Sequence, residues 1–203
     1  MNEVVSVSVT FFGYAMLAVF AQNAIFTRAL GVSRLVNLVR DDRTSNLLFG
    51  LQLCITQVLV APLAWYTGSW LLPLDNRAQL RPLVFVLTLA VVCVAEQLVL
   101  TACKSHPVAA TLRRIVPLAA FNSCVLGTVL VERTQSFTLS QSLGFGLGSG
   151  LGYLLAVLLV AEAGNRLRSK AIPSAFRGLP ITLVYIGVLA LAIYGFTGHS
   201  VIL

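Results

Sequence analysis

The sequence has 203 residues, of which 58% are hydrophobic and 10% are charged. A soluble domain carries about 25% charged residues, so this chain has too little polar surface to coat a soluble globule of its size. The net charge of +7 does not indicate nucleic-acid binding, because the basic residues form no dense patch with interleaved aromatic residues.

Six long apolar runs follow one another along the chain, and each is near the roughly 20 residues that a helix needs to cross a hydrocarbon layer of about 30 Å. They cover Val4–Thr27, Leu47–Leu72, Pro82–Cys103, Leu112–Val131, Ser142–Ala163 and Leu179–Thr197. The sequence therefore predicts an all-α polytopic membrane protein with six transmembrane helices in a single membrane domain over residues 1–203.

Lys and Arg residues are distributed unevenly among the five connections between these runs. Connections one, three and five hold eleven of the fourteen, namely Arg28, Arg34, Arg40, Arg43, Lys104, Arg113, Arg114, Arg166, Arg168, Lys170 and Arg177. Connections two and four hold Arg77, Arg81 and Arg133. Because Lys and Arg accumulate in cytoplasmic loops, this bias predicts that the odd-numbered connections are cytoplasmic and that both termini lie outside.

The six predicted spans divide into two sets of three, residues 1–103 and residues 104–203. A duplicated unit with an odd number of spans inserts its two copies with opposite orientations, which is the inverted-repeat plan of many transport proteins. We therefore expect two inverted three-helix repeats.

The first helix of each repeat carries polar or helix-weakening residues in its second part. These residues are Gln22, Asn23 and Gly31 in the first helix, and Pro117, Asn122, Ser123 and Gly127 in the fourth. A broken helix persists in lipid only where the freed backbone faces protein or a water-lined cavity. Asn23, Asn122 and Ser123 are therefore candidates for a shared polar site between two broken helices. The alternative is that the two asparagines only form interhelical hydrogen bonds, which contribute about 1 kcal/mol each.

Glu96 lies deep inside the predicted third span, about 10 Å from its cytoplasmic end. Burial of a carboxylate there costs several kcal/mol unless the group is protonated, paired or hydrated, so this intramembrane acid is a functional candidate. The alternative is a protonated carboxyl that is hydrogen-bonded to a neighbouring helix. Glu132 and Glu162 lie near the ends of spans, where we expect them to reach water.

Gly144, Gly148 and Gly152 form two overlapping G-x-x-x-G steps on one face of the predicted fifth helix. Small residues at this spacing predict the close approach of another helix. They do not indicate a nucleotide-binding loop, because no predicted strand precedes them.

The sequence contains no Ser-His-Asp set, no metal-ligand cluster and no Walker loop, so it indicates no catalytic site of its own. The cysteines form no C-x-x-C pair, and Cys54, Cys93 and Cys103 have the character of small apolar core residues. Cys124 directly follows the candidate residues Asn122 and Ser123.

Several segments together resemble the family of Rnf A-subunits and Nqr E-subunits, the six-helix membrane subunits of redox-driven ion pumps. Residues 172–178, I-P-S-A-F-R-G, are similar to the V-P-x-P/A-F-R-G that precedes the last helix in that family. Residues 116–118 and 122–127, V-P-L and N-S-C-V-L-G, are similar to its L-P-L and T-N-C-A-V-L-G. Arg81, the V-A-E ending at Glu96, and Asn23 with the A-L-G-V-S of residues 29–33 also resemble family segments.

This resemblance implies a membrane subunit of an ion-translocating complex in the bacterial plasma membrane. It also implies partners, namely an inverted homologous membrane subunit together with further subunits of the complex. The chain itself would be at most a non-catalytic subunit of an oxidoreductase. The alternative function is that of a cluster-free relative that acts as a small-solute or ion transporter or as a membrane scaffold.

The chain departs from the family at the residues that would hold a cofactor. The family's first broken helix reads F-L-G-L-C-P-x-x-G-V-S, and its cysteine ligates an iron–sulfur cluster between two inverted subunits. Here Gly31 continues directly into Val32, Ser123 stands at the second ligand position, and Cys124 is turned by about 100° around the helix. We therefore expect no cluster on this chain alone; the alternative is a [2Fe–2S] cluster shared with a partner subunit, with Cys124 as a metal ligand.

Overall fold

The computed structural model describes residues 2–40, 46–73, 75–102, 107–167 and 172–198. Within these residues the chain is all-helical, as predicted. The elements are α1 (Asn2–Val19), α2 (Val32–Arg40), α3 (Asn46–Trp70), α4 (Arg77–Ala102), α5 (Pro107–Ala120), α6 (Ser123–Thr134), α7 (Leu139–Leu167), the short 3-10 helix η1 (Ser174–Phe176) and α8 (Leu179–Thr197).

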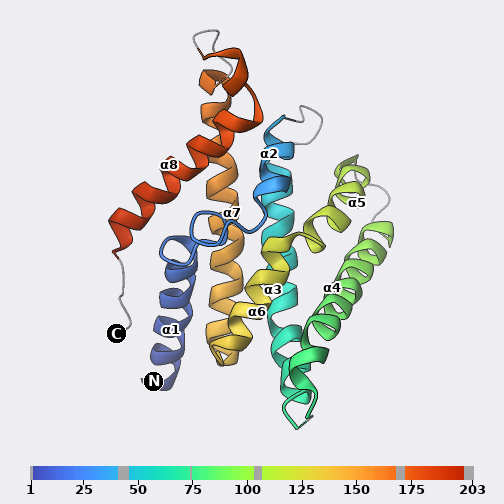
Figure 1. Ribbon diagram of the computed structural model, residues 1–203. Coiled ribbons are helices and arrows are strands. Elements are labelled where there is room, and N and C mark those ends of the chain that lie inside the picture. Colours follow the sequence, from blue (N-terminus) through green and yellow to red (C-terminus); the bar gives the residue numbers. More distant parts are fainter. Residues whose placement is uncertain (1, 41–45, 74, 103–106, 168–171, 199–203) are drawn as a thin grey trace.

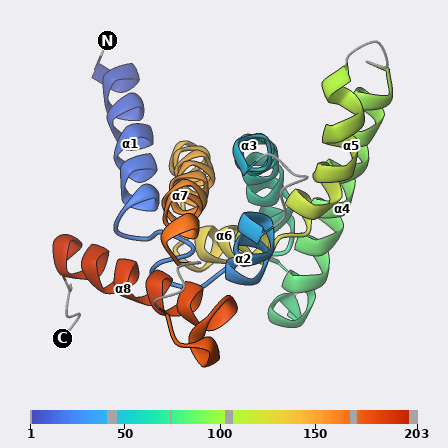
Figure 2. The same cartoon turned by 90° about the horizontal axis from the view of Figure 1, so that it is seen from above.

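Helices α3 and α7 run side by side through the centre of the bundle (Figure 1). Helix α1 packs along α7, whereas α4 and α5 pack against α3 and against each other. Helix α8 is splayed outward from the bundle and contacts α7 mainly (Figure 2). Ile186 is the one described residue of α8 that is buried, and Tyr185, Leu189, Ala190 and Ile193 are partly buried against the main core. The other side of this apolar helix is exposed, including Leu183, Val188 and Leu191.

Four of the described helices, namely α3, α4, α7 and α8, are long and apolar enough to cross a membrane, and the bent pair α5–α6 is a fifth candidate. The apolar part of α1, Val4–Val19, is shorter. The coarse prediction of a multi-pass helical membrane protein is therefore confirmed, while the count of six spans stays a prediction.

Both predicted helix interruptions are present. The first predicted run, Val4–Thr27, is not one helix, because α1 ends at Val19 and residues 20–31 pass through turns before α2 begins. The fourth run begins earlier than predicted, at Pro107, and α5 and α6 meet at an angle of 47°. Pro117 lies inside α5, which ends three residues later. It has no backbone N–H to bond the Arg113 carbonyl, which accepts a 2.7 Å hydrogen bond from the Gln97 side-chain amide of α4 instead.

Helix α2 lies in the segment for which the sequence predicts the first charged connection, and this segment is not an exposed loop. Leu35, Val36 and Leu38 of the nine-residue helix are buried in the main core. The guanidinium of Arg34 lies 5.2 Å from the centre of the Phe49 ring, which is a cation–π distance. The segment is only nine residues long and contains Arg34 and Arg40 among its apolar residues, so an average over the segment does not reveal that it forms an amphipathic helix.

The predicted close packing at the glycines of the fifth span is confirmed. A Cβ atom placed on Gly148 would lie 2.8 Å from Ala15 Cα, and one on Gly144 would lie 3.2 Å from Phe11 Cα. The backbone of α1 thus rests directly on α7, which is possible only because these positions carry no side chain. This contact fixes the end of α1 and places the first helix break against the middle of α7.

Candidate functional site

Asn23 organises the first break and is completely buried. Its side-chain oxygen accepts hydrogen bonds from the backbone N–H groups of Ile25, at 2.9 Å, and Phe26, at 3.2 Å. Its amide nitrogen donates to the carbonyls of Val19, at 2.8 Å, and Gly152 on α7, at 3.2 Å. Asn23 therefore replaces helical hydrogen bonds that the interrupted backbone lost and ties the break to the central helix.

Asn122 organises the second break in a similar way. It is the N-cap of α6, and its side-chain oxygen accepts a 2.9 Å hydrogen bond from the backbone N–H of Cys124. Asparagine is among the preferred N-cap residues because its short side chain satisfies a free amide of the first turn. Its amide nitrogen donates to the hydroxyl of Tyr153 on α7, at 3.3 Å.

The two breaks meet at Gly31. The backbone N–H of Gly31 donates to the Ser123 hydroxyl at 2.9 Å, and the Tyr153 hydroxyl donates to the Gly31 carbonyl at 3.4 Å. Gly31 has φ +77°, and a Cβ there would lie 2.7 Å from the Tyr153 ring and 2.8 Å from the Asn122 side-chain oxygen. Only glycine fits this position, because it tolerates positive φ and has no side chain.

The structure thus brings Asn122 and Ser123 together at Gly31, while Asn23 bonds to Gly152, the residue of α7 that precedes Tyr153. The hydrogen bonds of both asparagines go to groups of this chain, which agrees with the packing role that the sequence left open. Their role as a polar site for an ion or solute stays a prediction.

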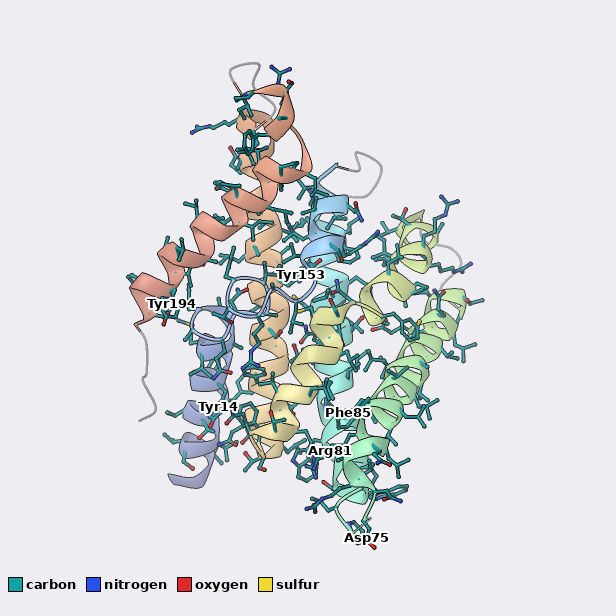
Figure 3. All side chains as sticks on the ribbon, in the orientation of Figure 1. Tyr14, Asp75, Arg81, Phe85, Tyr153 and Tyr194 are labelled. Atoms are coloured by element: carbon teal, nitrogen blue, oxygen red, sulfur yellow. The ribbon has the colours of Figure 1, made fainter. Side chains whose placement is uncertain are left out.

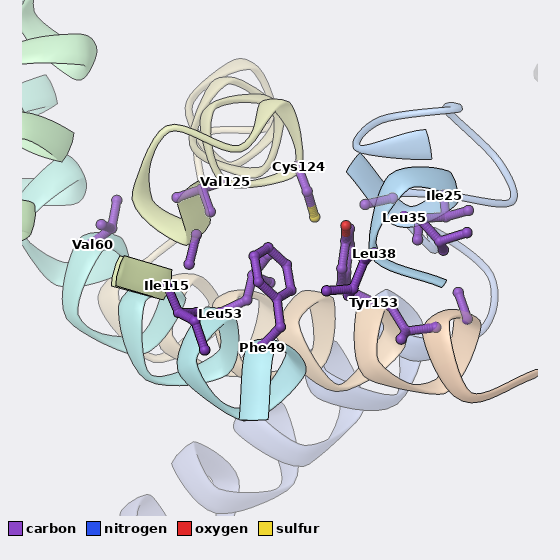
Figure 4. Packing of buried hydrophobic residues seen from close by; sticks show 14 of the residues in the cluster. Ile25, Leu35, Leu38, Phe49, Leu53, Val60, Ile115, Cys124, Val125 and Tyr153 are labelled. Carbon is purple, nitrogen blue, oxygen red and sulfur yellow. The ribbon is translucent and has the colours of Figure 1, made fainter. Parts of the chain in front are cut away.

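Ser123 and Cys124 face in different directions, as their offset of about 100° around the helix requires. Ser123 is exposed at the edge of the break, whereas Cys124 is completely buried. The Cys124 sulfur accepts a hydrogen bond from the Gln57 side-chain amide of α3 at 3.3 Å and lies 3.8 Å from the Ser149 hydroxyl of α7. Figure 4 shows Cys124, Tyr153 and Phe49 converging in the same part of the core.

This donor set does not fit an iron–sulfur cluster. A [2Fe–2S] cluster takes four ligands that are normally thiolates. The outward-facing position of the second break carries a hydroxyl that is already bonded to Gly31, and the neighbouring thiol points into the contact of α3 with α7. The described residues hold no group of three or more His, Cys, Asp or Glu residues in metal-binding arrangement.

Glu96 lies on α4 and is buried against α3. Its carboxylate accepts hydrogen bonds from the Gln52 amide at 3.0 Å and from the Thr56 hydroxyl at 3.0 and 3.1 Å. It lines an apolar groove of about 440 Å³ between α3, α4 and α5, whose walls include Ile55, Val92 and Leu112. These hydrogen bonds and this groove involve none of the residues that organise the breaks, so the two predicted polar features are separate sites.

Glu132 corrects one prediction, since this residue does not reach water. Its side chain is buried between α6 and α7, where the Ser142 hydroxyl donates to Oε2, and Oε1 has no partner among the described residues. Glu162, by contrast, is exposed as predicted. The sequence alone does not single out Gln57, Thr128, Ser149 and Tyr153, although the four-residue spacing of Cys124, Thr128 and Glu132 places these three residues on one helix face.

Comparison with known proteins shows to which family the chain belongs. Residues 11–200, which include both breaks and all the residues above, match the family described as "Rnf-Nqr subunit, membrane protein". The chain belongs to this family. It is 32% identical over 182 residues to a protein of Syntrophotalea carbinolica that is named as the A-subunit of the ion-translocating oxidoreductase complex, covering 89% of this chain and 93% of the relative. The A-subunit of the same name from Yersinia enterocolitica is also 32% identical, over 89% of this chain and 92% of its own.

Proposed function

We propose that this Rnf-Nqr family chain is a membrane subunit of an Rnf-type ion-translocating oxidoreductase complex. The observation that carries the proposal is that the likeness to the A-subunits of such complexes spans almost the whole chain, including both helix breaks. A role as a free-standing transporter or scaffold is not favoured, because the relatives are named as subunits of one complex.

The proposed topology has six passages, with α1–α2 and α5–α6 each counted as one broken passage. The arrangement of the helices supports two inverted repeats, residues 1–103 and 104–203, because α7 is flanked by α1 and α8 much as α3 is flanked by α5 and α4 (Figure 1). The repeats would then be related by an axis between α3 and α7, as in other proteins of this plan.

The proposed orientation has both termini outside the plasma membrane. Helix α2, the first turns of α5 and the end of α7, which carry Arg34, Arg113 and Arg166, lie at one end of the bundle (Figure 1), and Arg81 lies at the other (Figure 3). The arrangement agrees with the positive-inside bias. Arg43, Lys104, Arg168, Lys170 and both chain ends lie outside the described residues.

We further propose that this chain contributes to assembly and ion movement without holding a cluster. Support comes from the hydroxyl of Ser123 at the exposed edge of the break and from the inward direction of Cys124. If a cluster is shared with a partner, the other subunit supplies its ligands and Cys124 must turn outward.

The partner at the breaks is proposed to be an inverted homologous subunit. Phe121 is 55% exposed beside Ser123, and a groove of about 860 Å³ between α1 and α8 opens next to the first break at Gln22 and Thr27. A single thin bundle leaves this mixed polar and apolar edge uncovered, and two chains of opposite orientation can cover each other's edges. Because the charge bias allows one orientation of this chain, the partner is a distinct paralogue.

Purification and cross-linking from native membranes test this function. We expect the tagged chain to copurify with other subunits of an Rnf-type complex, identified by mass spectrometry. A cysteine at Phe121 should form cross-links to a homologous subunit, and a matched cysteine at Leu98, which is 65% exposed on α4, should not. Recovery of the chain alone, or with cross-links only to itself, would contradict the proposal.

A further inference from the structure

A column of buried polar side chains runs inside the bundle between α3, α6 and α7. Cys124, Thr128 and Glu132 follow one another at four-residue spacing on α6 and are 0%, 4% and 6% exposed. Ser142 and Ser149 on α7, each 1% exposed, and Gln57 on α3, 2% exposed, complete the column. The helices could form without these polar side chains. Polar and ionisable groups buried in a membrane are costly, so a buried acid among them is a candidate for a function.

The part of the column near Cys124 is a continuous set of hydrogen bonds. The hydroxyls of Thr128 and Ser149 are 2.8 Å apart, and the Gln57 amide nitrogen lies 3.3 Å from both Ser149 Oγ and Cys124 Sγ. Hydroxyl groups both donate and accept hydrogen bonds, so this set can reorient without losing all its partners. It ends beside Asn122 and Tyr153, where the two helix breaks meet.

The other end of the column holds Glu132, which lies about two helical turns from Cys124 along α6. Glu132 lines a small cavity of about 10 Å³ with Ala64, Trp65, Val129, Arg133 and Ser142. Its Oε1 and the side-chain oxygen of Gln57 are two buried atoms without a hydrogen-bond partner in the described part of the chain. A Cβ on Gly146 would lie 2.9 Å from Ala61 Cβ, 3.3 Å from the backbone carbonyl oxygen of Gln57 and 3.7 Å from Glu132 Oε1, so α7 packs closely against α3 beside the carboxyl at this glycine.

The small cavity beside Glu132 suits the binding of a proton better than that of a metal cation. The cavity holds about one water-sized probe, and Glu132 and Ser142 are the two lining residues with side-chain oxygens. Hard cations take six or more oxygen ligands. The charged group on the same wall is Arg133, which donates to the Gly68 carbonyl at 2.6 Å, and Arg81 of α4 adds positive charge beside it. The lining residues of α3 and α7 carry no charge, so Glu132 is the single carboxylate among the residues that line this cavity, and its lining offers too few oxygen ligands for a metal ion.

We propose that Glu132 is a proton-binding group, which takes up a proton from water on its free oxygen and releases it again. It lies at one end of the buried polar column, and the hydrogen-bonded set of Thr128, Ser149 and Gln57 lies between it and the junction of the breaks. The protonation forms one O–H bond on the carboxylate, and deprotonation returns the proton to water. The role of this site in ion movement rests on the proposed function, whereas the protonation itself does not.

Infrared spectroscopy of the full chain in lipid tests the protonation. The carbonyl stretch of a protonated carboxyl should disappear as the pH rises, and the difference between wild type and Glu132→Gln should contain this band. The matched control, Glu162→Gln, removes an exposed acid and should leave the band unchanged. Glu132→Asp keeps the carboxyl and should retain a shifted band, which covers the case in which Glu132→Gln fails to fold.

Three outcomes would overturn the proposal: a Glu132 carboxyl that is ionised throughout the pH series, one that stays protonated throughout, or a band that sodium chloride removes at constant pH. In the assembled complex we expect Glu132→Gln to copurify with its partners and to lose ion movement. Failure of copurification for the wild-type chain would count against the proposed function, while an unaltered infrared band in Glu132→Gln would count against the proton site alone.

Discussion

The contact between α1 and α7 makes a strong prediction for Gly148→Ala. The added methyl group would lie 2.8 Å from the Ala15 Cα, and the Ala15 carbonyl oxygen is closer still. Carbon atoms pack best at about 3.5–4.0 Å, so α1 must move away by about 1 Å. Because the obstacle is backbone, no side-chain rotation can relieve it.

The expected cost follows from this geometry. Overpacking in a close-packed core costs about 1–3 kcal/mol, and Gly148→Ala should be near the upper value because a whole helix must shift. Part of the loss is offset by the higher helix propensity of alanine, which is worth about 1 kcal/mol. For a chain of this size a net loss of about 2 kcal/mol lowers the midpoint of thermal unfolding by about 4–8 °C.

Gly13→Ala provides the matched control, since Gly13 lies on α1 itself and a Cβ there would meet nothing within 4 Å. Thermal unfolding of both variants is compared with wild type in the same mild detergent, by the loss of monodisperse protein on size exclusion. The reasoning is refuted if Gly148→Ala is as stable as Gly13→Ala, because α1 would then not rest on α7 as described.

Three further predictions concern topology, cofactor and the second acid. A reporter fused after Leu203, which lies outside the described residues, should be active only outside the cytoplasm; an active cytoplasmic reporter would reverse the orientation. Iron and sulfide analysis of anaerobically purified protein should find no stoichiometric cluster, and a cluster that is lost on Cys124→Ala would restore the alternative. Glu96→Gln should fold, at a cost of about 1 kcal/mol from its hydrogen bonds with Gln52 and Thr56, but should impair ion-coupled activity. Unchanged ion movement at normal yield would assign Glu96 a packing role.

The features that the sequence predicted well are those with a local cause. The breaks follow from Asn23, Pro117 and Asn122, which disturb a helix wherever they occur in one. The close contact of a helix with α7 follows from glycines at four-residue spacing, and the different directions of Ser123 and Cys124 follow from the rotation per residue. None of these inferences requires knowledge of which helices become neighbours.

The features that the sequence missed depend on tertiary contacts. Glu132 is close to the end of its helix, a position that normally reaches water, but the short connection from α6 to α7 folds Ser142 back over it. The burial of α2 depends likewise on Phe49, which supplies both an apolar wall and a ring face for Arg34. Distance along the chain from a span end therefore says little about burial when the next helix returns across the same end.

The two breaks also bear on where the proposed inverted partner would meet this chain. Inside the bundle Asn23, Asn122 and Tyr153 form hydrogen bonds with backbone groups that the two breaks free. On the outer side Ser123 and the Phe121 ring are exposed, and in the proposed topology this edge would lie near the middle of the bilayer, where a polar group facing lipid is unfavourable. A second chain of opposite orientation would present its own break at the same depth, because inversion about an axis in the membrane plane leaves the middle of the bilayer in place. If this proposal is right, Ser123 would form a hydrogen bond across the interface at the position where the family resemblance places a ligand thiol, and the edge would serve assembly without a metal between the two chains.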